Sequence, residues 1–343
     1  MRRAIAGGAP GGYRRPVMAR IDPPRPERPF ARIEADAGET LAALDKAFVV
    51  AAYRTHGALL FTGFGVDAGA LRGLADRLCR TAVINDSPGR DAIDAAGQIF
   101  TVNRGQDAFA LHPELSREPW KPDAAFFACL TPPDGEGATT VCDGVALARA
   151  LPADVRAGLE RRRLVYPAPT WPGLFAYWLG TPEPSDALLA NPPASCPYRF
   201  ARGADGSVFR YFTRPALHRP MFADGPAFGN FLLFARFTNG RGDFPLLDDM
   251  TPVPEEWLQA IKAAGDALTA RVEWQRGDLL VLDNTRFMHG RTAIANPAIR
   301  LIATRFGYLD FARPDPEEPA DPVWRREDFV PPIPPWHPGL AQR

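Results

Sequence analysis

The stretch of sequence that decides the fold is GDLLVLDNTRFMHGRTAI, residues 277–294. Its first half is a glycine turn followed by an apolar run of the kind that forms a buried β-strand. The chain leaves this strand through polar residues and then presents His289, Gly290 and Arg291 in succession. Only five histidines occur in the chain, so the placement of this one asks for a reason. A lone histidine here is more often a core or rim residue than a metal ligand, and other segments must decide.

Short β-rich runs separated by Gly, Pro and Asp make up much of the chain after residue 97. The runs are QIFTV (98–102), AFALHPEL (108–115), AAFFACLTPP (124–133), ATTVCDG (138–144), SVFRYF (207–212), FLLFARF (231–237), DLLVLDN (278–284) and LIATRFGYL (301–309). Helical spacing of apolar residues marks four other segments, which are residues 35–53, 67–80, 145–162 and 254–272. Many short strands with flanking helices indicate a β-barrel or a β-sandwich as the core.

We predict one domain over residues 31–312, with a helical and lid-like insertion at about 150–275. Residues 1–30 are expected to form a mobile Pro/Arg-rich arm, and residues 313–343 a Pro-rich tail along the surface. Residues 166–200 combine prolines with aromatic residues, so they should fold over another part of the protein. Both a covering lid and an ordinary structured insertion stay open for them.

A Gly-x-Gly turn between a predicted strand and a predicted helix needs its own interpretation. With Asp86 further along, Gly63 and Gly65 give the outline of a dinucleotide-binding unit. The third glycine, Gly69, is spaced more widely than that motif requires, and the chain does not go on alternating strands and helices. We therefore favour a strand-to-helix turn that uses glycine for its backbone freedom.

The composition of the chain indicates which classes of binding partner to expect. Its 343 residues include 40 basic and 40 acidic side chains, so no excess positive charge favours nucleic acid, and a small-molecule substrate is the better expectation. The four cysteines form no CxxC pair, which indicates reduced thiols in a cytoplasmic protein. No signal-peptide core and no membrane-spanning run is found, so we expect no membrane association. The sequence leaves the oligomeric state open.

Two further elements favour a metal-binding role for His289. His112 and Glu114 lie two residues apart on a run with strand character, so both face the same way, although such a triplet arises easily by chance. Arg300 opens an apolar strand, where a guanidinium is unusual unless an anion meets it. Two imidazoles and one carboxylate on one ion form a facial triad that suits non-heme Fe(II), because three positions stay open. A closed zinc site would require a fourth ligand that this spacing does not offer.

These segments carry a resemblance to a known family. HPE at 112–114, GEGATTVCDG at 135–144, WQRGDLLVLDNTRFMHGRTAI at 274–294 and Arg300 together resemble the TauD/TfdA superfamily of Fe(II)- and 2-oxoglutarate-dependent oxygenases. The glutamate in place of the commoner aspartate resembles the clavaminate-synthase-like and SyrP-like branch. The resemblance covers roughly residues 57–308. It implies a mixed β fold with flanking helices around a double-stranded β-helix, or jelly roll, of about eight core strands.

The resemblance also implies a role for each site residue. His112, Glu114 and His289 hold the iron, and 2-oxoglutarate chelates the iron through its keto acid. The far carboxylate of 2-oxoglutarate pairs with Arg300 and with the hydroxyl of Thr139, a geometry in which a planar guanidinium offers two charge-assisted hydrogen bonds.

The choice of threonine rests on strand geometry. Thr139 and Thr140 face opposite ways on a strand, so only one of them can point into the site. We prefer Thr139 from its distance after the first histidine, and Thr140 is the alternative.

The activity implied by the resemblance is hydroxylation of an unactivated C–H bond with O2 and 2-oxoglutarate. The implied substrate is small and amino-acid-like, either free or bound to a carrier protein, in specialised metabolism such as antibiotic biosynthesis. The same iron centre could instead desaturate, epoxidise or cyclise. More distant alternatives are an NAD-dependent enzyme and a non-catalytic jelly-roll binding protein. Substrate contacts are unknown: Arg117, Trp171, Trp178 and Arg210 are candidates from location alone, and we favour a structural role for each.

Overall fold

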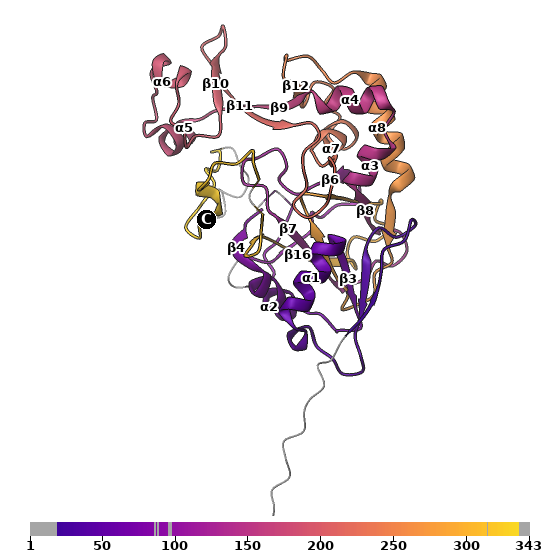
Figure 1. Ribbon diagram of the computed structural model, residues 1–343. Helices are drawn as coiled ribbons and strands as arrows, with labels where there is room; N and C mark the ends of the chain where they lie inside the picture. The colour runs from indigo at the N-terminus through magenta and orange to yellow at the C-terminus, as the bar shows by residue number, and fades with distance from the viewer. Residues whose placement is uncertain (1–18, 86, 88, 95–97, 314, 336–343) are drawn as a thin grey trace, which may run out of the picture.

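The structure of the protein, a computed structural model, describes residues 19–335 except 86, 88, 95–97 and 314 (Figure 1). Residues 1–18 of the predicted arm, residues 336–343 of the predicted tail and Asp86 lie outside the described residues. The four cysteines are free in the structure. Among the described helices, none is long and apolar enough to cross a membrane.

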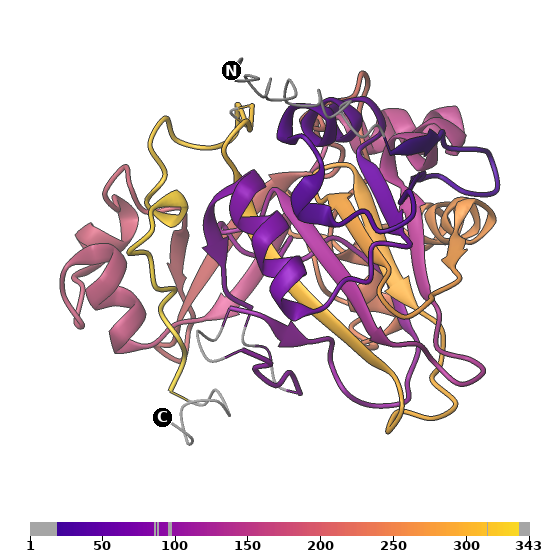
Figure 2. The ribbon, with the colours of Figure 1, turned by 90° about the horizontal axis from the view of Figure 1, so that it is seen from below.

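An eight-stranded, mostly antiparallel sheet forms the centre of the molecule. In spatial order its strands are β1 (Arg20–Asp22), β2 (Ala31–Glu34), β3 (Ala58–Thr62), β14 (Leu279–Asp283), β7 (Ala124–Thr131), β16 (Leu301–Leu309) and β4 (Cys79–Val83), with β5 (Phe100–Thr101) paired to β16. The helices α1 (Lys46–His56) and α2 (Ala68–Leu78) cover its outer face (Figure 2). In β14, Leu279 and Val281 pack toward these helices, whereas Leu280 faces the interior. Both faces are buried, which explains the continuous apolar run.

A second sheet, of four strands, packs against the inner face of the large one. Its strands in order are β13 (Ala270–Val272), β8 (Thr139–Asp143), β15 (Phe287–Arg291) and β6 (Phe109–His112). Val141 on its inner face shares a core with Leu280 of the large sheet. Met288 on its outer face packs with Leu258 of α8 (Glu255–Leu268), which covers this side. The two sheets are therefore the two walls of one sandwich.

The stretch 277–294 gives one strand to each wall. It enters the large sheet as β14 and, after a short turn, enters the small sheet as β15. Its apolar half fills the centre of the large sheet, and its polar half is carried across to the opposite wall. The predicted fold class is confirmed: mixed β structure with flanking helices around two facing sheets.

A third sheet lies beyond the sandwich, in the order β10-β11-β9-β12. Its elements and the helices next to it are α4 (Ala153–Glu160), β9 (Arg163–Pro169), α5 (Pro172–Leu179), α6 (Asp186–Ala190), β10 (Arg199–Arg202), β11 (Val208–Pro215) and β12 (Leu246–Leu247). Figure 1 shows α5, α6 and the ends of β10 and β11 projecting away from the two main sheets. The C-terminal segment with η2 (Val323–Arg325) runs beside them, where Trp324 lies 6.5 Å from Trp178 between ring centroids (Figure 2). A lid function for residues 166–200 stays a prediction.

Three predicted helices have different limits in the structure. The helix predicted over 254–272 ends at Leu268, and its last residues form β13. The helix predicted over 35–53 begins at Lys46, because Asp45 caps it and accepts a hydrogen bond (2.7 Å) from a backbone N–H of the first turn. The helix predicted over 145–162 is divided at Pro152, which has no N–H to continue it. The parts are α3 (Gly144–Ala150) and α4, and the 3-10 turn η1 (Leu41–Ala43) precedes α1.

The run FLLFARF, predicted as a strand, is the helix α7 (Leu232–Phe237). Oδ1 of Asn230 accepts a hydrogen bond from the N–H of Leu232 (3.0 Å), which holds the first turn. A short apolar run fits a strand and a buried helix equally well, so periodicity could not separate the two.

The Gly-x-Gly turn has the geometry of a packed turn. Gly63 and Gly65 have φ angles of 81° and 61°, which favour glycine. A Cβ on Gly277 would lie 2.9 Å from the Cα of Gly65, so this turn also meets the turn before β14 at close range. The strand β3 pairs with β14 in an antiparallel manner, which a doubly wound parallel sheet would not contain.

Candidate metal centre

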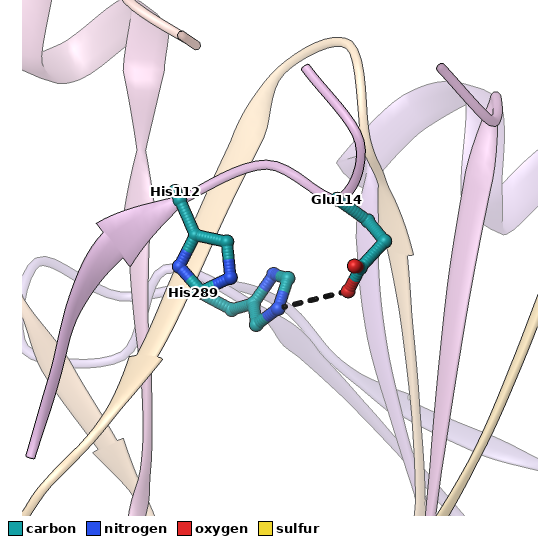
Figure 3. A group of neighbouring side chains, drawn as sticks. All are labelled: His112, Glu114 and His289. Atoms are coloured by element: carbon teal, nitrogen blue, oxygen red, sulfur yellow. Dashed lines mark ion pairs between the residues drawn. The ribbon is translucent and has the colours of Figure 1, made fainter. Parts of the chain in front are cut away.

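Three side chains meet between the two sheets, at the end of β6 (Figure 3). His112 is the last residue of β6, and His289 on β15 is its partner in the strand register. Glu114 lies just past the strand end, and Pro113 between the two residues has no N–H to extend the ladder. Ligand atoms of the three residues lie within 4.8 Å of one another, and Nε2 of His289 is 3.7 Å from Oε2 of Glu114. A single ion can therefore contact all three.

The two imidazoles are in the form that binds a metal ion. Nδ1 of His112 lies 2.9 Å from the carbonyl oxygen of Ala110, to which it donates in the tautomer that leaves the Nε2 lone pair free. Burial lowers the pKa of His112 below its ordinary value. Burial, together with the neighbouring His112, lowers the pKa of His289 much further. Both rings are therefore neutral at physiological pH, as metal ligation requires.

Buried polar groups hold Glu114, which is 4% exposed. Nδ2 of Asn85 donates to its Oε1, and Nη2 of Arg90 lies 3.3 Å from both carboxylate oxygens. Asn284 holds the backbone: the N–H of Glu114 donates to Oδ1 (2.8 Å), and Nδ2 donates to the carbonyl of Glu114 (3.0 Å). The same Nδ2 donates to the carbonyl of Pro122 (2.8 Å). The turn after β14 is thus joined to the segment that carries the carboxylate.

Replacing Asn284 with alanine is expected to lower the free energy of unfolding by about 2–4 kcal/mol, because three buried backbone groups lose their partners. Iron affinity should fall about tenfold as well, since the segment with Glu114 is no longer held. Chemical denaturation measures the first effect and metal titration the second. Asn191→Ala, at the exposed end of α6, is the control and should change neither. An unchanged denaturation midpoint in Asn284→Ala would show that this network does not hold Glu114.

A second polar group lies near the three side chains and is built on Arg300, which immediately precedes β16 and is 8% exposed. Its Nε donates to the carbonyl of Gly137 (2.8 Å), and its Nη2 donates to Oγ1 of Thr139 (3.2 Å). Nη1 is buried and has no hydrogen-bond partner among the described residues. Burial lowers the pKa of Arg300 to about 10, which keeps it protonated at neutral pH. A buried cation with a free N–H fits an anionic ligand.

The two threonines of β8 lie on opposite faces. Thr139 is 4% exposed, and its Oγ1 accepts hydrogen bonds from Arg300 and from Nε1 of Trp274 (2.9 Å). Thr140 lines a different cavity, which also contains Lys262 of α8. The structure therefore places Thr139, and not Thr140, next to Arg300.

One cavity of about 340 Å³ contains both polar groups. Its lining includes His112, Glu114, Thr139, His289 and Arg300. The aromatic part of the wall is Phe109, Phe127, Phe231 and Phe234. Phe234 comes from α7, and its ring lies 4.4 Å from the ring of His112 between centroids. Aromatic rings therefore form one part of a wall that is otherwise mostly polar.

A second cavity, of about 560 Å³, adjoins the first. The residues that line both are Asn85, Ser87, Leu115 and Arg117. Trp171, Arg210 and residues 331–334 of the C-terminal segment line the second cavity. Trp178 packs in the apolar core instead. Of the four candidate substrate contacts, three therefore line a cavity.

The donor set fits Fe(II). Two neutral imidazoles and one carboxylate are the ligands of a facial triad, which leaves further positions on the ion open. The free Nη1 of Arg300, in the same cavity, fits a carboxylate of an organic acid that occupies some of those positions. The arrangement can therefore hold a divalent metal together with an anionic organic ligand.

Four residues that hold the site were missed in the sequence: Asn85, Arg90, Trp274 and Asn284. Asn284 directly follows a buried strand, and a polar amide in that position is a signal that could have been used. Trp274 lies in a quoted motif, but its partner Thr139 is far away in the chain. Asn85 and Arg90 belong to an irregular loop without a periodic pattern, so no local signal pointed to the cavity.

Comparisons with known proteins agree with this geometry. The family model described as "Taurine catabolism dioxygenase TauD, TfdA family" matches residues 24–305. No curated protein matches the chain in sequence. Among solved structures, PvcB from Pseudomonas aeruginosa has a TM-score of 0.56 and 17% identity, and the match covers 90% of this chain and 98% of PvcB. PvcB is described as an Fe, alpha-ketoglutarate dependent oxygenase from an isonitrile synthetic pathway.

Two further solved structures have the same architecture. A taurine dioxygenase from Burkholderia xenovorans has a TM-score of 0.59 and 15% identity, over 88% of this chain and 92% of that chain. AAD-2, in complex with Mn(II) and N-oxalylglycine, has a TM-score of 0.54 and 15% identity, over 88% of this chain and 100% of its own. Because the sequence identities are this low, the similarity to these solved structures shows the fold alone.

Proposed function

Because the chain belongs to the TauD/TfdA family of dioxygenases, we propose that His112, Glu114 and His289 hold Fe(II) and that Arg300 and Thr139 hold 2-oxoglutarate beside it. The protein is a non-heme Fe(II)- and 2-oxoglutarate-dependent dioxygenase. The observation that carries the residue assignment is the meeting of a buried metal-binding trio and a guanidinium with a free N–H in one cavity.

The residues of the chain have distinct tasks in the proposed reaction. Bound Fe(II) supplies, with 2-oxoglutarate and O2, an oxidising centre that removes hydrogen from an unactivated C–H bond, with succinate and CO2 as coproducts. His112 is fixed by its bond to Ala110 so that Nε2 serves the ion. Arg300 grips the far carboxylate of the cosubstrate through charge-assisted hydrogen bonds. The phenylalanines of the cavity wall offer apolar contacts that can position a substrate beside the ion.

We propose that the reaction is hydroxylation of a small, amino-acid-like substrate in specialised metabolism, in the cytoplasm. Glu114 as the carboxylate ligand supports the clavaminate-synthase-like and SyrP-like branch. The adjoining cavity supports an extended substrate, because it offers room for a carrier-bound arm as well as for a free amino acid. Desaturation, epoxidation and cyclisation at the same iron centre are the alternatives, since they differ only in where the substrate lies.

Purified protein with Fe(II), ascorbate and 2-oxoglutarate should form succinate, and a chelator should stop the reaction. A panel of free and carrier-bound amino acids should contain compounds that accelerate succinate formation. Mass spectrometry of the product then divides the outcomes into two groups: hydroxylation and epoxidation add one oxygen atom, whereas desaturation and cyclisation remove two hydrogen atoms. Succinate formation that continues at an equal rate without iron would contradict the proposed function.

Thr139→Val is expected to raise the Kd of 2-oxoglutarate about five- to tenfold, because the hydrogen bond that the threonine hydroxyl donates to the cosubstrate carboxylate is lost. Thr140→Val is the matched control on the neighbouring residue and should leave this Kd unchanged, since it lines the other cavity. Anaerobic calorimetric titration measures both. A larger loss in Thr140→Val than in Thr139→Val would exchange the two assignments.

A further inference from the structure

The cavity at the metal centre carries an excess of positive charge. Its charged lining residues are four arginines, Arg90, Arg117, Arg291 and Arg300, and one acid, Glu114. The two histidines add no charge when they bind a metal ion, because metal ligation uses the neutral imidazole. A ferrous ion and doubly charged 2-oxoglutarate cancel each other, so the excess persists in the loaded site. Buried charge without a counter-charge is costly, and a bound anion would remove that cost.

Three of the four arginines are already accounted for. Arg300 is assigned to 2-oxoglutarate. Arg291 donates to the backbone carbonyls of Gly105 (3.1 Å) and Asp107 (3.0 Å), and so it holds the loop next to the cavity. The side chain of Arg117 is 45% exposed, so water screens its charge.

Arg90, whose side chain is 8% exposed, differs from the other three because it is paired with Glu114. Its Nε donates to Oδ1 of Asn103 (2.8 Å), and its Nη1 donates to Oγ1 of Thr304 (3.3 Å). Both partners are neutral. Nη2 lies 3.3 Å from each carboxylate oxygen of Glu114, which is its acidic partner among the described residues. The guanidinium also lies over the ring of Phe306, at 5.4 Å from the ring centroid.

The partner of Arg90 is also the proposed metal ligand, and this has an electrostatic consequence. A carboxylate that binds a divalent ion shares its negative charge with that ion. Arg90 then lies beside a cation and keeps only part of its counter-charge. Loading the site with metal should therefore increase the affinity of Arg90 for another anion. The hydroxyl of Thr304 accepts from Nη1 and donates to the carbonyl of Phe100 (3.2 Å), so it holds the guanidinium in place.

We propose that Arg90 binds a carboxylate of the organic substrate, so that the substrate is a carboxylic acid rather than a neutral or cationic molecule. This inference rests on the proposed function and narrows its substrate class. A planar guanidinium held on one edge by Asn103 is suited to a carboxylate, because it offers parallel N–H groups. The aromatic residues that line the same cavity suit an apolar remainder of the substrate.

Binding of matched acids and amides to the loaded protein tests the proposal without turnover. The protein is prepared anaerobically with Fe(II) and 2-oxoglutarate, and iron content and the 2-oxoglutarate Kd are measured first. Calorimetry then compares acetate with acetamide and a panel of amino acids with their C-terminal amides. The acids should bind about ten- to a hundredfold more tightly than the amides. Acetate should also bind more weakly to the iron-free protein, where Glu114 is fully available to Arg90.

Variants separate an anion-binding role for Arg90 from mere positioning of Glu114. Arg90→Gln should remove the preference for acids over amides, and Arg90→Lys, which keeps the charge, should retain part of it. Arg117→Gln is the matched control from the same cavity and should keep the preference. A positioning role alone would weaken iron binding in Arg90→Gln and leave the ratio of acid to amide affinity unchanged.

The outcomes distinguish this inference from the proposed function. Failure of the wild-type protein to bind iron or 2-oxoglutarate would overturn the proposed function. Normal iron and 2-oxoglutarate binding, with acids bound no better than amides, would overturn the role of Arg90 alone. An acid preference that survives in Arg90→Gln would overturn it too, because it would show that the acids bind the iron directly or another residue.

Discussion

Replacing His289 with alanine is expected to abolish iron-dependent formation of succinate. The substitution removes one of three ligands from a buried site in which no described side chain is placed to take over, since the nearest imidazole, His112, is already part of the group. Loss of a group that only supports a metal ligand costs up to about a hundredfold, so loss of the ligand itself should exceed that. Iron content after desalting and the rate of succinate formation measure the effect.

His56→Ala is the control for this substitution. His56 ends α1 and belongs neither to the trio nor to the cavity lining, so it should be replaceable without loss of iron. His289→Ala should also keep the far-ultraviolet circular dichroism of the wild type, because the imidazole is not part of the strand ladder. Full iron content and full activity in a folded His289→Ala protein would show that the metal is held elsewhere.

Replacing Arg300 with alanine is expected to raise the Kd of 2-oxoglutarate about a hundredfold. The change removes a charge-assisted hydrogen bond together with the buried positive charge that the carboxylate needs, and each contributes to the loss. Iron affinity should change little, because Arg300 is not among the three residues of the trio. Anaerobic titration of the iron-loaded protein measures the cosubstrate affinity directly.

Arg300→Lys is the matched variant for this prediction. A lysine keeps the charge but loses the planar fork, so its Kd should lie between those of the wild type and Arg300→Ala. An unchanged Kd in Arg300→Ala would place the carboxylate of the cosubstrate at another cation of the cavity, and the assignment of Arg300 would be wrong.

The fold class could be predicted because local patterns determine it. Many short β-rich runs separated by turn residues indicate a barrel or a sandwich, and the structure has two facing sheets. The limits of the helices could be predicted less well from the sequence. Asp45 and Pro152 set helix limits that apolar spacing alone does not reveal. The run FLLFARF became a helix because its partners in the core, rather than its own periodicity, decide its conformation.

Less of the candidate site than of the fold class could be predicted from the sequence. The sequence put His112 and Glu114 together and suggested His289 and Arg300, and the structure brings all of them into one cavity; their ligand roles stay predictions. The meeting of His112 with His289 could not be predicted, because it depends on strand register. β15 pairs with β6 so that the two histidines are opposite one another, and spacing along the chain does not give such a pairing.

Arg90 illustrates the limit of sequence reasoning most clearly. It lies in an irregular loop, and its partners Glu114, Asn103 and Thr304 come from three other parts of the chain. Long-range contacts of a loop side chain follow from the packing of the whole fold, and no local pattern encodes them. The excess positive charge of the cavity is therefore visible only once the sheets are assembled.

Anaerobic titration of 2-oxoglutarate into the Fe(II)-loaded protein tests the central claim most directly, because it requires both the metal and the cosubstrate to be in place. The account predicts a weak visible charge-transfer band that saturates at one 2-oxoglutarate per iron, needs higher concentrations in Arg300→Ala and is absent in His289→Ala. A protein that retains iron but develops no band, or a band of equal strength in His289→Ala, would contradict it.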